Sequence, residues 1–72
     1  DEKKELIKAL AKRISKERKK RGISLEQLAY EMGISKGNLS DIENGKRDPR
    51  YSTLKAIADG LDISISSLLK NL

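Results

Sequence analysis

Apolar residues recur every three or four positions through most of this chain, which is the spacing of one buried face on an α-helix. The first 22 residues show this best, and Gly22 follows a basic last turn. The pattern predicts an amphipathic helix over about 3–21. Its stripe continues onto Arg18, and a charge at a core-facing position is costly unless it is paired, so we expect a carboxylate partner downstream. The apolar positions are Leu6, Ile7, Leu10, Ala11 and Ile14.

Four shorter segments begin with one arrangement, in which an apolar residue precedes a Ser and an apolar or small residue follows four positions after it. A Ser at the N-cap accepts a hydrogen bond from a free backbone N–H of the first turn, and the flanking pair packs across the helix start. Gln27, three residues after the first of these Ser residues, is expected to complete a capping box. The expected caps are Ser24, Ser35, Ser52 and Ser64.

Glycines and one proline mark the ends of these segments. Stops are expected at Gly33, at Gly45 and in the stretch 60–62, with Pro49 in the connection before the fourth helix. The sequence has no strand-like alternation and no internal repeat. It therefore predicts one all-α domain over residues 1–72, a compact five-helix bundle with helices over about 3–21, 25–32, 36–44, 53–61 and 65–71.

The second and third predicted helices are joined by a turn so short that they must meet at a tight corner. Ala29 is small enough for the next helix to approach, and Gly33 can adopt the left-handed conformation that ends the first helix of the pair. Leu39 and Ile42 are placed to anchor the second helix to the core. This is the spacing of a helix-turn-helix.

Short polar side chains occupy the positions of the 36–44 segment that packing does not use, and three cations follow in the loop. One interpretation is an ordinary solvated helix face. The tight corner and the cationic loop favour a helix that lies in a DNA major groove, where base edges pair with Lys, Asn and Asp. Lys46, Arg47 and Arg50 would then lie near phosphates. The polar face consists of Lys36, Gly37, Ser40, Asp41 and Asn44.

Composition removes several classes of function. The 72 residues include no Cys and no His, which excludes zinc sites of the finger or ribbon type and removes Cys or His nucleophiles and the usual general base. An enzyme is disfavoured, and no cofactor or metal is expected. No stretch approaches the roughly 18 apolar residues of a membrane span, and the N-terminus lacks the apolar core of a signal peptide. A cytoplasmic protein is therefore expected.

The net charge of +5 is concentrated in the first predicted helix, because residues 1–22 hold ten Lys and Arg against four Asp and Glu. The remaining residues hold six against seven. The basic segment is either a stripe that binds a polyanion or the solvated face of a helix.

The chain resembles the lambda-repressor-like (Cro/repressor, Xre-type) helix-turn-helix domains over about residues 8–70. The resemblance implies a DNA-binding domain of a prokaryotic or phage transcription regulator, with the helix-turn-helix formed by the second and third helices, usually bound as a homodimer to a palindromic operator in double-stranded DNA. The positions that carry it are Arg18, Gly22, Ser24, Glu26, Leu28-Ala29, Gly33-Ile34-Ser35, Leu39-Ser40, Ile42-Glu43-Asn44-Gly45, Arg47, Pro49, Leu54, Ile57-Ala58 and Leu61.

The resemblance also implies roles for single residues. In this family the matching Arg and Glu pair, so Arg18 is expected to pair with Glu43 and join the first helix to the end of the third. Backbone contacts fall near the start of the second helix and on Asn44, Lys46 and Arg47. The residues implied to read bases are Ser35, Lys36, Gly37, Asn38, Ser40 and Asp41.

Three positions depart from the family pattern. Leu25 stands where many members have a Gln that touches a phosphate, and Gly37 has no side chain where many members read a base. Asp62 replaces the usual Gly after the fourth helix, which predicts local strain. Asp41 is open to two interpretations, since it can select cytosine or repel phosphate.

Several more specific functions fit these features. A regulator of this kind could be a phage-type repressor, a restriction-modification controller, an antitoxin or the DNA-binding part of a longer chain. The other class is a protein-interaction module of the same fold, whose binding would not depend on Lys46, Arg47 or Arg50. Apolar residues of the last helix either form a homodimer interface or belong to the core, and they are Ile65, Leu68, Leu69 and Leu72.

Overall fold

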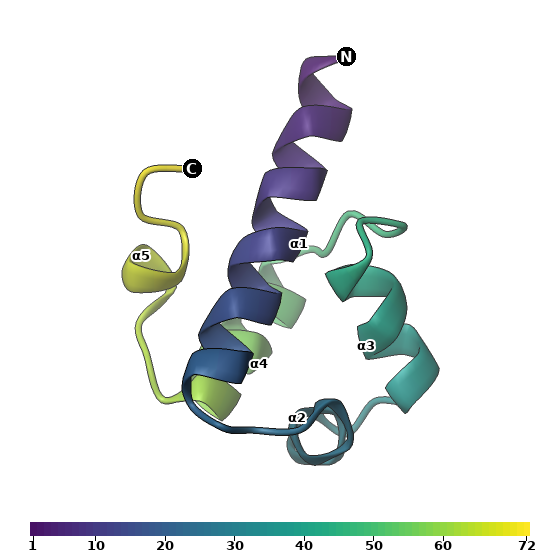
Figure 1. The fold of residues 1–72 in the computed structure, drawn as a ribbon, viewed down its shortest axis with the longest axis vertical. Coiled ribbons are helices and arrows are strands. Elements are labelled where there is room, and N and C mark those ends of the chain that lie inside the picture. The colour runs from purple at the N-terminus through teal and green to yellow at the C-terminus, as the bar shows by residue number, and fades with distance from the viewer.

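The computed structural model describes all 72 residues and contains five helices and no strand (Figure 1). This architecture confirms the all-α, five-helix prediction. None of the helices has the length and apolarity that crossing a membrane requires. The helices are α1 (Glu2–Lys20), α2 (Leu25–Met32), α3 (Lys36–Glu43), α4 (Tyr51–Leu61) and α5 (Ile65–Leu68).

α1 runs through the middle of the molecule, with α3 on one side of it and α5 on the other (Figure 1). α2 lies at the bottom of the view, seen end-on, between the C-terminal end of α1 and α3 (Figure 1). Every helix contributes to one cluster of buried apolar side chains. Leu68 of α5 is fully buried there, and Ile65 and Leu69 pack against the cluster. These residues of the last helix therefore belong to the core, whereas Leu72 is 44% exposed. The cluster consists of Ile14, Leu28, Ala29, Leu39, Ile42, Ile57, Ala58, Leu61 and Leu68.

Three of the four expected Ser caps form. The hydroxyls of Ser24, Ser35 and Ser64 each accept a backbone N–H three residues ahead, at 3.0 Å. The Gln27 side chain makes no return bond to Ser24, so the expected capping box is only half formed. Its amide is exposed, and water competes for it.

The expected cap at Ser52 is wrong, because α4 begins at Tyr51 and Ser52 lies inside its first turn. The N-cap is Arg50, whose backbone is extended and whose side chain makes no cap bond. Its carbonyl accepts the N–H of Leu54 at 3.0 Å, which closes the first helical turn two residues earlier than the Ser pattern predicts. The first N–H groups of α4 consequently have no side-chain acceptor.

The last helix is shorter than expected, ending at Leu68 rather than near 71. Arg13 of α1 reaches the chain at this point and donates to the carbonyls of Leu68 (3.1 Å) and Lys70 (2.8 Å). These hydrogen bonds from Arg13 satisfy carbonyl groups that the end of the helix leaves without a partner. Asn71 then takes a left-handed conformation with φ of 64°. The other helix ends lie within one residue of expectation.

Candidate nucleic-acid interface

A tight corner joins the end of α2 to the start of α3. Gly33 ends α2 with φ of 71°, a conformation that a residue with a Cβ adopts at a cost. The N–H of Ile34 then donates to the carbonyl of Ala29 at 3.1 Å, and Ser35 caps α3 directly afterwards. Ala29 is buried between the helices, with 3% of its surface exposed. Because its side chain is small, α3 can approach α2 closely there. The corner forms as the spacing of these residues predicts.

An ion pair between helices fixes the far end of α3. Arg18 donates from Nε to Glu43 Oε2 at 2.7 Å and from Nη2 to Glu43 Oε1 at 2.9 Å, and its Nη1 donates to the carbonyl of Ile23 at 2.9 Å. The two side chains are only 11% and 7% exposed. The hydrogen bonds to Glu43 raise the pKa of Arg18 above its usual value, so the guanidinium stays charged. This is the pair that the family resemblance implies.

Most of the residues expected to read bases lie on the outward side of α3, because Leu39 and Ile42 occupy its buried side. Asn38 lies only about 40° around the helix from Ile42, at the edge of the buried side. Lys36 and Gly37 are exposed, and Asn38, Ser40 and Asp41 are half-buried. A Cβ at Gly37 would meet no atom within 4 Å, so this position leaves open space for a close neighbour. The hydroxyl of Ser35 is already engaged as the cap of α3.

Two cations of this surface are held by carboxylates. Lys36 Nζ lies 3.3 Å from Glu26 Oε2, across the corner between α2 and α3. The pKa of Glu26 is lowered, first by a hydrogen bond from its own backbone and then by Lys36. Arg47 Nε lies 3.5 Å from Asp41 Oδ2. Glu26 is one of the residues that carry the family resemblance, but it is not among the expected site residues, because its contact with Lys36 depends on the corner rather than on sequence spacing.

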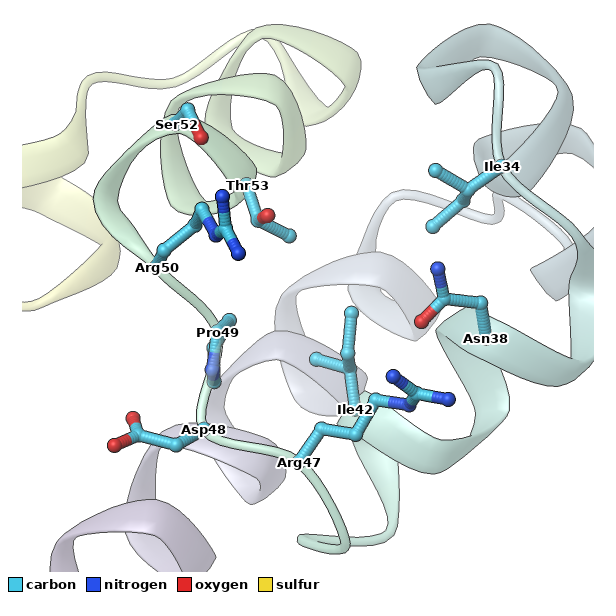
Figure 2. A pocket seen from close by; sticks show the side chains of 9 residues that line it. All are labelled: Ile34, Asn38, Ile42, Arg47, Asp48, Pro49, Arg50, Ser52 and Thr53. Carbon is cyan, nitrogen blue, oxygen red and sulfur yellow. The ribbon is translucent and has the colours of Figure 1, made fainter.

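A hollow lies between α3 and the start of α4 (Figure 2). Arg47 extends toward Asn38 on one side of it, Arg50 extends beside Thr53 on the other, and Asp48 points away. Lys46 is exposed in the same loop but does not line the hollow. The lining residues are Ile34, Asn38, Ile42, Arg47, Asp48, Pro49, Arg50, Ser52 and Thr53.

Ser52 and Thr53 were not expected at this site. Both lie in the first turn of α4, whose backbone N–H groups lack a side-chain acceptor. The hollow therefore has these hydrogen-bond donors in addition to the two arginines. Such a combination of guanidinium groups and free helix N–H groups suits an anion. Sequence reasoning missed it because Ser52 resembles a cap.

Known proteins with similar sequences are regulators. A family model described as helix-turn-helix (HTH_3) matches residues 14–68. The chain is 37% identical over 60 residues to the immunity repressor protein of Bacillus phage phi105, and 38% identical over 61 residues to the transcriptional regulator SinR of Bacillus subtilis. Each match covers 83% of this chain but only 42% and 55% of the relative, so the chain spans about half the length of these curated relatives.

Solved structures of similar fold include SinR in complex with DNA, with a TM-score of 0.75 and 37% identity over 85% of this chain and 98% of that one. The restriction-modification controller protein C.AhdI from Aeromonas hydrophila gives a TM-score of 0.83 and 28% identity over 90% of this chain and 97% of that one. The sequence match over residues 14–68 and these relatives show that the protein belongs to the lambda-repressor-like (Xre-type) HTH_3 helix-turn-helix family.

Proposed function

We propose that this protein binds double-stranded DNA sequence-specifically and regulates transcription as a repressor, with α3 in the major groove of an operator. The observation that carries the proposal is the outward polar face of α3, which the corner at Gly33 and the Arg18–Glu43 pair hold in a fixed orientation. A rigid helix with short polar side chains can approach base edges closely. The relatives support this role, since one is named an immunity repressor and another is solved in complex with DNA.

In this proposal one group of residues contacts bases and another contacts the phosphate backbone. The outward face of α3 contacts base edges, and the residues around the hollow contact the phosphate backbone, where arginines and free N–H groups meet. This role needs no catalytic residue, cofactor or metal ion, and it places the protein in the cytoplasm with the DNA. The proposed base contacts are Ser35, Lys36, Gly37, Asn38, Ser40 and Asp41, and the proposed backbone contacts are Asn44, Lys46, Arg47 and Arg50.

Selection of bound sequences from random duplex DNA tests the proposal directly. We expect one enriched motif, an inverted repeat whose half-sites lie about one helical turn apart, because a helix-turn-helix homodimer presents its two recognition helices at that spacing. Affinity for the motif is expected to fall steeply as salt rises, since bound phosphates release counterions. A selection that enriches no motif at low salt rules out operator binding and favours a protein-interaction module.

A restriction-modification controller is the second candidate. It is favoured by the likeness to C.AhdI, in which this chain covers 97% of the controller. Both candidates use the same surface, so the selected motif distinguishes them by its genomic position. A controller's motif would lie beside restriction and modification genes, and a phage-type repressor's motif would not.

Replacement of Lys36 and of Arg47 is expected to have different effects on the selected motif. Lys36→Ala removes a side chain at the start of α3 and should change the preferred bases, with about 1–3 kcal/mol of discrimination lost at one position. Arg47→Ala should weaken binding to all sequences alike and lower the salt slope by about 1. Repeating the selection and the salt titration with both variants measures this. Identical changes in the two variants would show that the roles are misassigned.

A further inference from the structure

Exposed lysines form a second positive surface on α1, apart from the helix-turn-helix. With 100° per residue, four of them lie within about 80° of one another around the helix axis. All four are exposed, and none takes part in any of the six ion pairs of the molecule. This surface, here named the lysine stripe, consists of Lys4, Lys8, Lys12 and Lys19.

The proposed reading surface, residues 35–50, has much less unpaired positive charge than the lysine stripe. Lys36 is paired with Glu26, and Arg47 is paired with Asp41. Residues 35–50 hold four Lys and Arg against three Asp and Glu. Only Lys46 and Arg50 of this region have no carboxylate partner, so it supplies few free cations for phosphates, and strong attraction to duplex DNA requires further cations elsewhere.

The lysine stripe lies beside the end of α3. A Cβ on Gly45 would be 3.7 Å from Lys8 Cγ and 3.9 Å from Ala11 Cβ, so this part of α1 touches the chain just after Asn44. Further along α1, Arg18 reaches Glu43 at the last residue of α3. α5 lies on the opposite side of α1 (Figure 1). The stripe is therefore next to a proposed backbone contact and continues away from it.

The stripe extends further than α3. From Lys4 to Lys19 it spans about 22 Å at 1.5 Å per residue, whereas α3 spans about 12 Å. A DNA strand presents one phosphate about every 3.4 Å of helix axis, so a surface of that length meets several of them. The exposed apolar side chain of α1, Leu6, lies about 160° around the helix from Lys8. A surface of lysines without an apolar anchor suits phosphates rather than a protein interface, where Lys is depleted.

We infer that the lysine stripe binds the phosphate backbone of duplex DNA next to the bases that α3 reads, and so lengthens the footprint beyond the operator core. This inference rests on the proposed function. It assigns affinity mainly to α1 and selection of sequence mainly to α3. Lysine is suited to this task because a flexible ammonium group follows phosphates without demanding one geometry.

The experiment compares a duplex that carries only the selected motif with the same duplex extended by random sequence at both ends. The wild-type protein should bind the extended duplex on the order of tenfold more tightly at low salt. The double variant Lys12→Gln, Lys19→Gln should lose most of that gain, and its salt slope on the extended duplex should fall by about 1.8, or 0.9 for each lost contact. Because both lysines are exposed, circular dichroism should show an unchanged fold.

Two matched variants are the controls. Lys55→Gln with Lys70→Gln removes the same charge from α4 and from the chain after α5, and it should keep the gain on the extended duplex. Lys12→Arg with Lys19→Arg keeps the charge and should also keep the gain. The inference is overturned if the Lys12/Lys19 Gln variant and the Lys55/Lys70 variant gain the same affinity from the extended duplex. It is also overturned if the Lys12/Lys19 Gln variant loses the same affinity on both duplexes. In both cases the motif still binds, so the proposed function stands. If the wild-type protein selects no motif, both fail.

Discussion

Replacement of Arg18 by Ala is expected to lower the free energy of unfolding by about 3–5 kcal/mol, because it leaves the nearly buried carboxylate of Glu43 without its partner. The carbonyl of Ile23 loses a donor in the same step. A domain of this size has about 4–11 kcal/mol in total, so the variant should be close to unfolding at physiological temperature. Thermal and urea denaturation measure the loss, and the melting temperature should fall by at least about 12 °C.

Variants at both ends of the pair separate the charge from the packing. Removing both partners together, as Arg18→Ala with Glu43→Ala, should cost less than the sum of the single variants, since neither charge is then left alone. Arg18→Met with Glu43→Leu should recover much of the stability, because apolar side chains of similar volume avoid the cost of desolvation. A melting temperature in Arg18→Ala equal to that of the wild type would show that the pair contributes nothing.

The sequence predicts much of the fold because short-range signals are strong here. A Ser hydroxyl at an N-cap bonds to a backbone N–H of the turn that directly follows it. The caps Ser24, Ser35 and Ser64 can therefore be predicted from neighbouring residues in the chain. Ser52 has the same local pattern, because an apolar pair also surrounds it, but the extended backbone of Arg50 starts α4 earlier. The end of α5 could not be predicted from local pattern, since it depends on Arg13, which is 55 residues away from Leu68 in the chain.

The site shows the same division between local and distant signals. The polar face of α3 follows from helical spacing, but the partner of Arg18 came from the family resemblance, because the buried position of Arg18 indicates only that some carboxylate is needed. The pairs Glu26–Lys36 and Asp41–Arg47 were not predicted. Both join exposed or partly exposed side chains across a corner or a loop, where the backbone path decides which opposite charges meet.

These pairs bear on how the reading surface works. If α3 reads bases as proposed, Lys36 must leave Glu26 to contact a base, and the Glu26 carboxylate is then left near the negative charge of the DNA. A correct base compensates for the lost contact, whereas an incorrect one does not. In the proposed function the acidic residues would thereby lower affinity for unrelated sequences, which is a form of selection by repulsion. The free lysines of α1 supply attraction without such a penalty.

Replacement of Leu39 by Ala is expected to cost about 3 kcal/mol, within the range of 2–5 kcal/mol seen for buried leucines. Leu39 is fully buried in the core, and it is the anchor nearer to the start of α3, where most of the proposed base contacts lie. The loss combines the transfer of its side chain from the core with the cavity that remains. Thermal denaturation should show a melting temperature lower by about 12–24 °C, and the urea slope should stay unchanged if the variant unfolds in one step.

Two substitutions make the Leu39 result specific to core packing. Leu6→Ala removes the same atoms from a side chain that is 59% exposed, and it should change stability by about 0.5 kcal/mol or less. Leu39→Met keeps the volume and should cost less than about 1.5 kcal/mol. Below its melting temperature the Leu39→Ala variant should still select the wild-type motif, because Ile42 and the Arg18–Glu43 pair continue to hold α3. Equal melting temperatures for Leu39→Ala and Leu6→Ala would show that α3 is not anchored through Leu39.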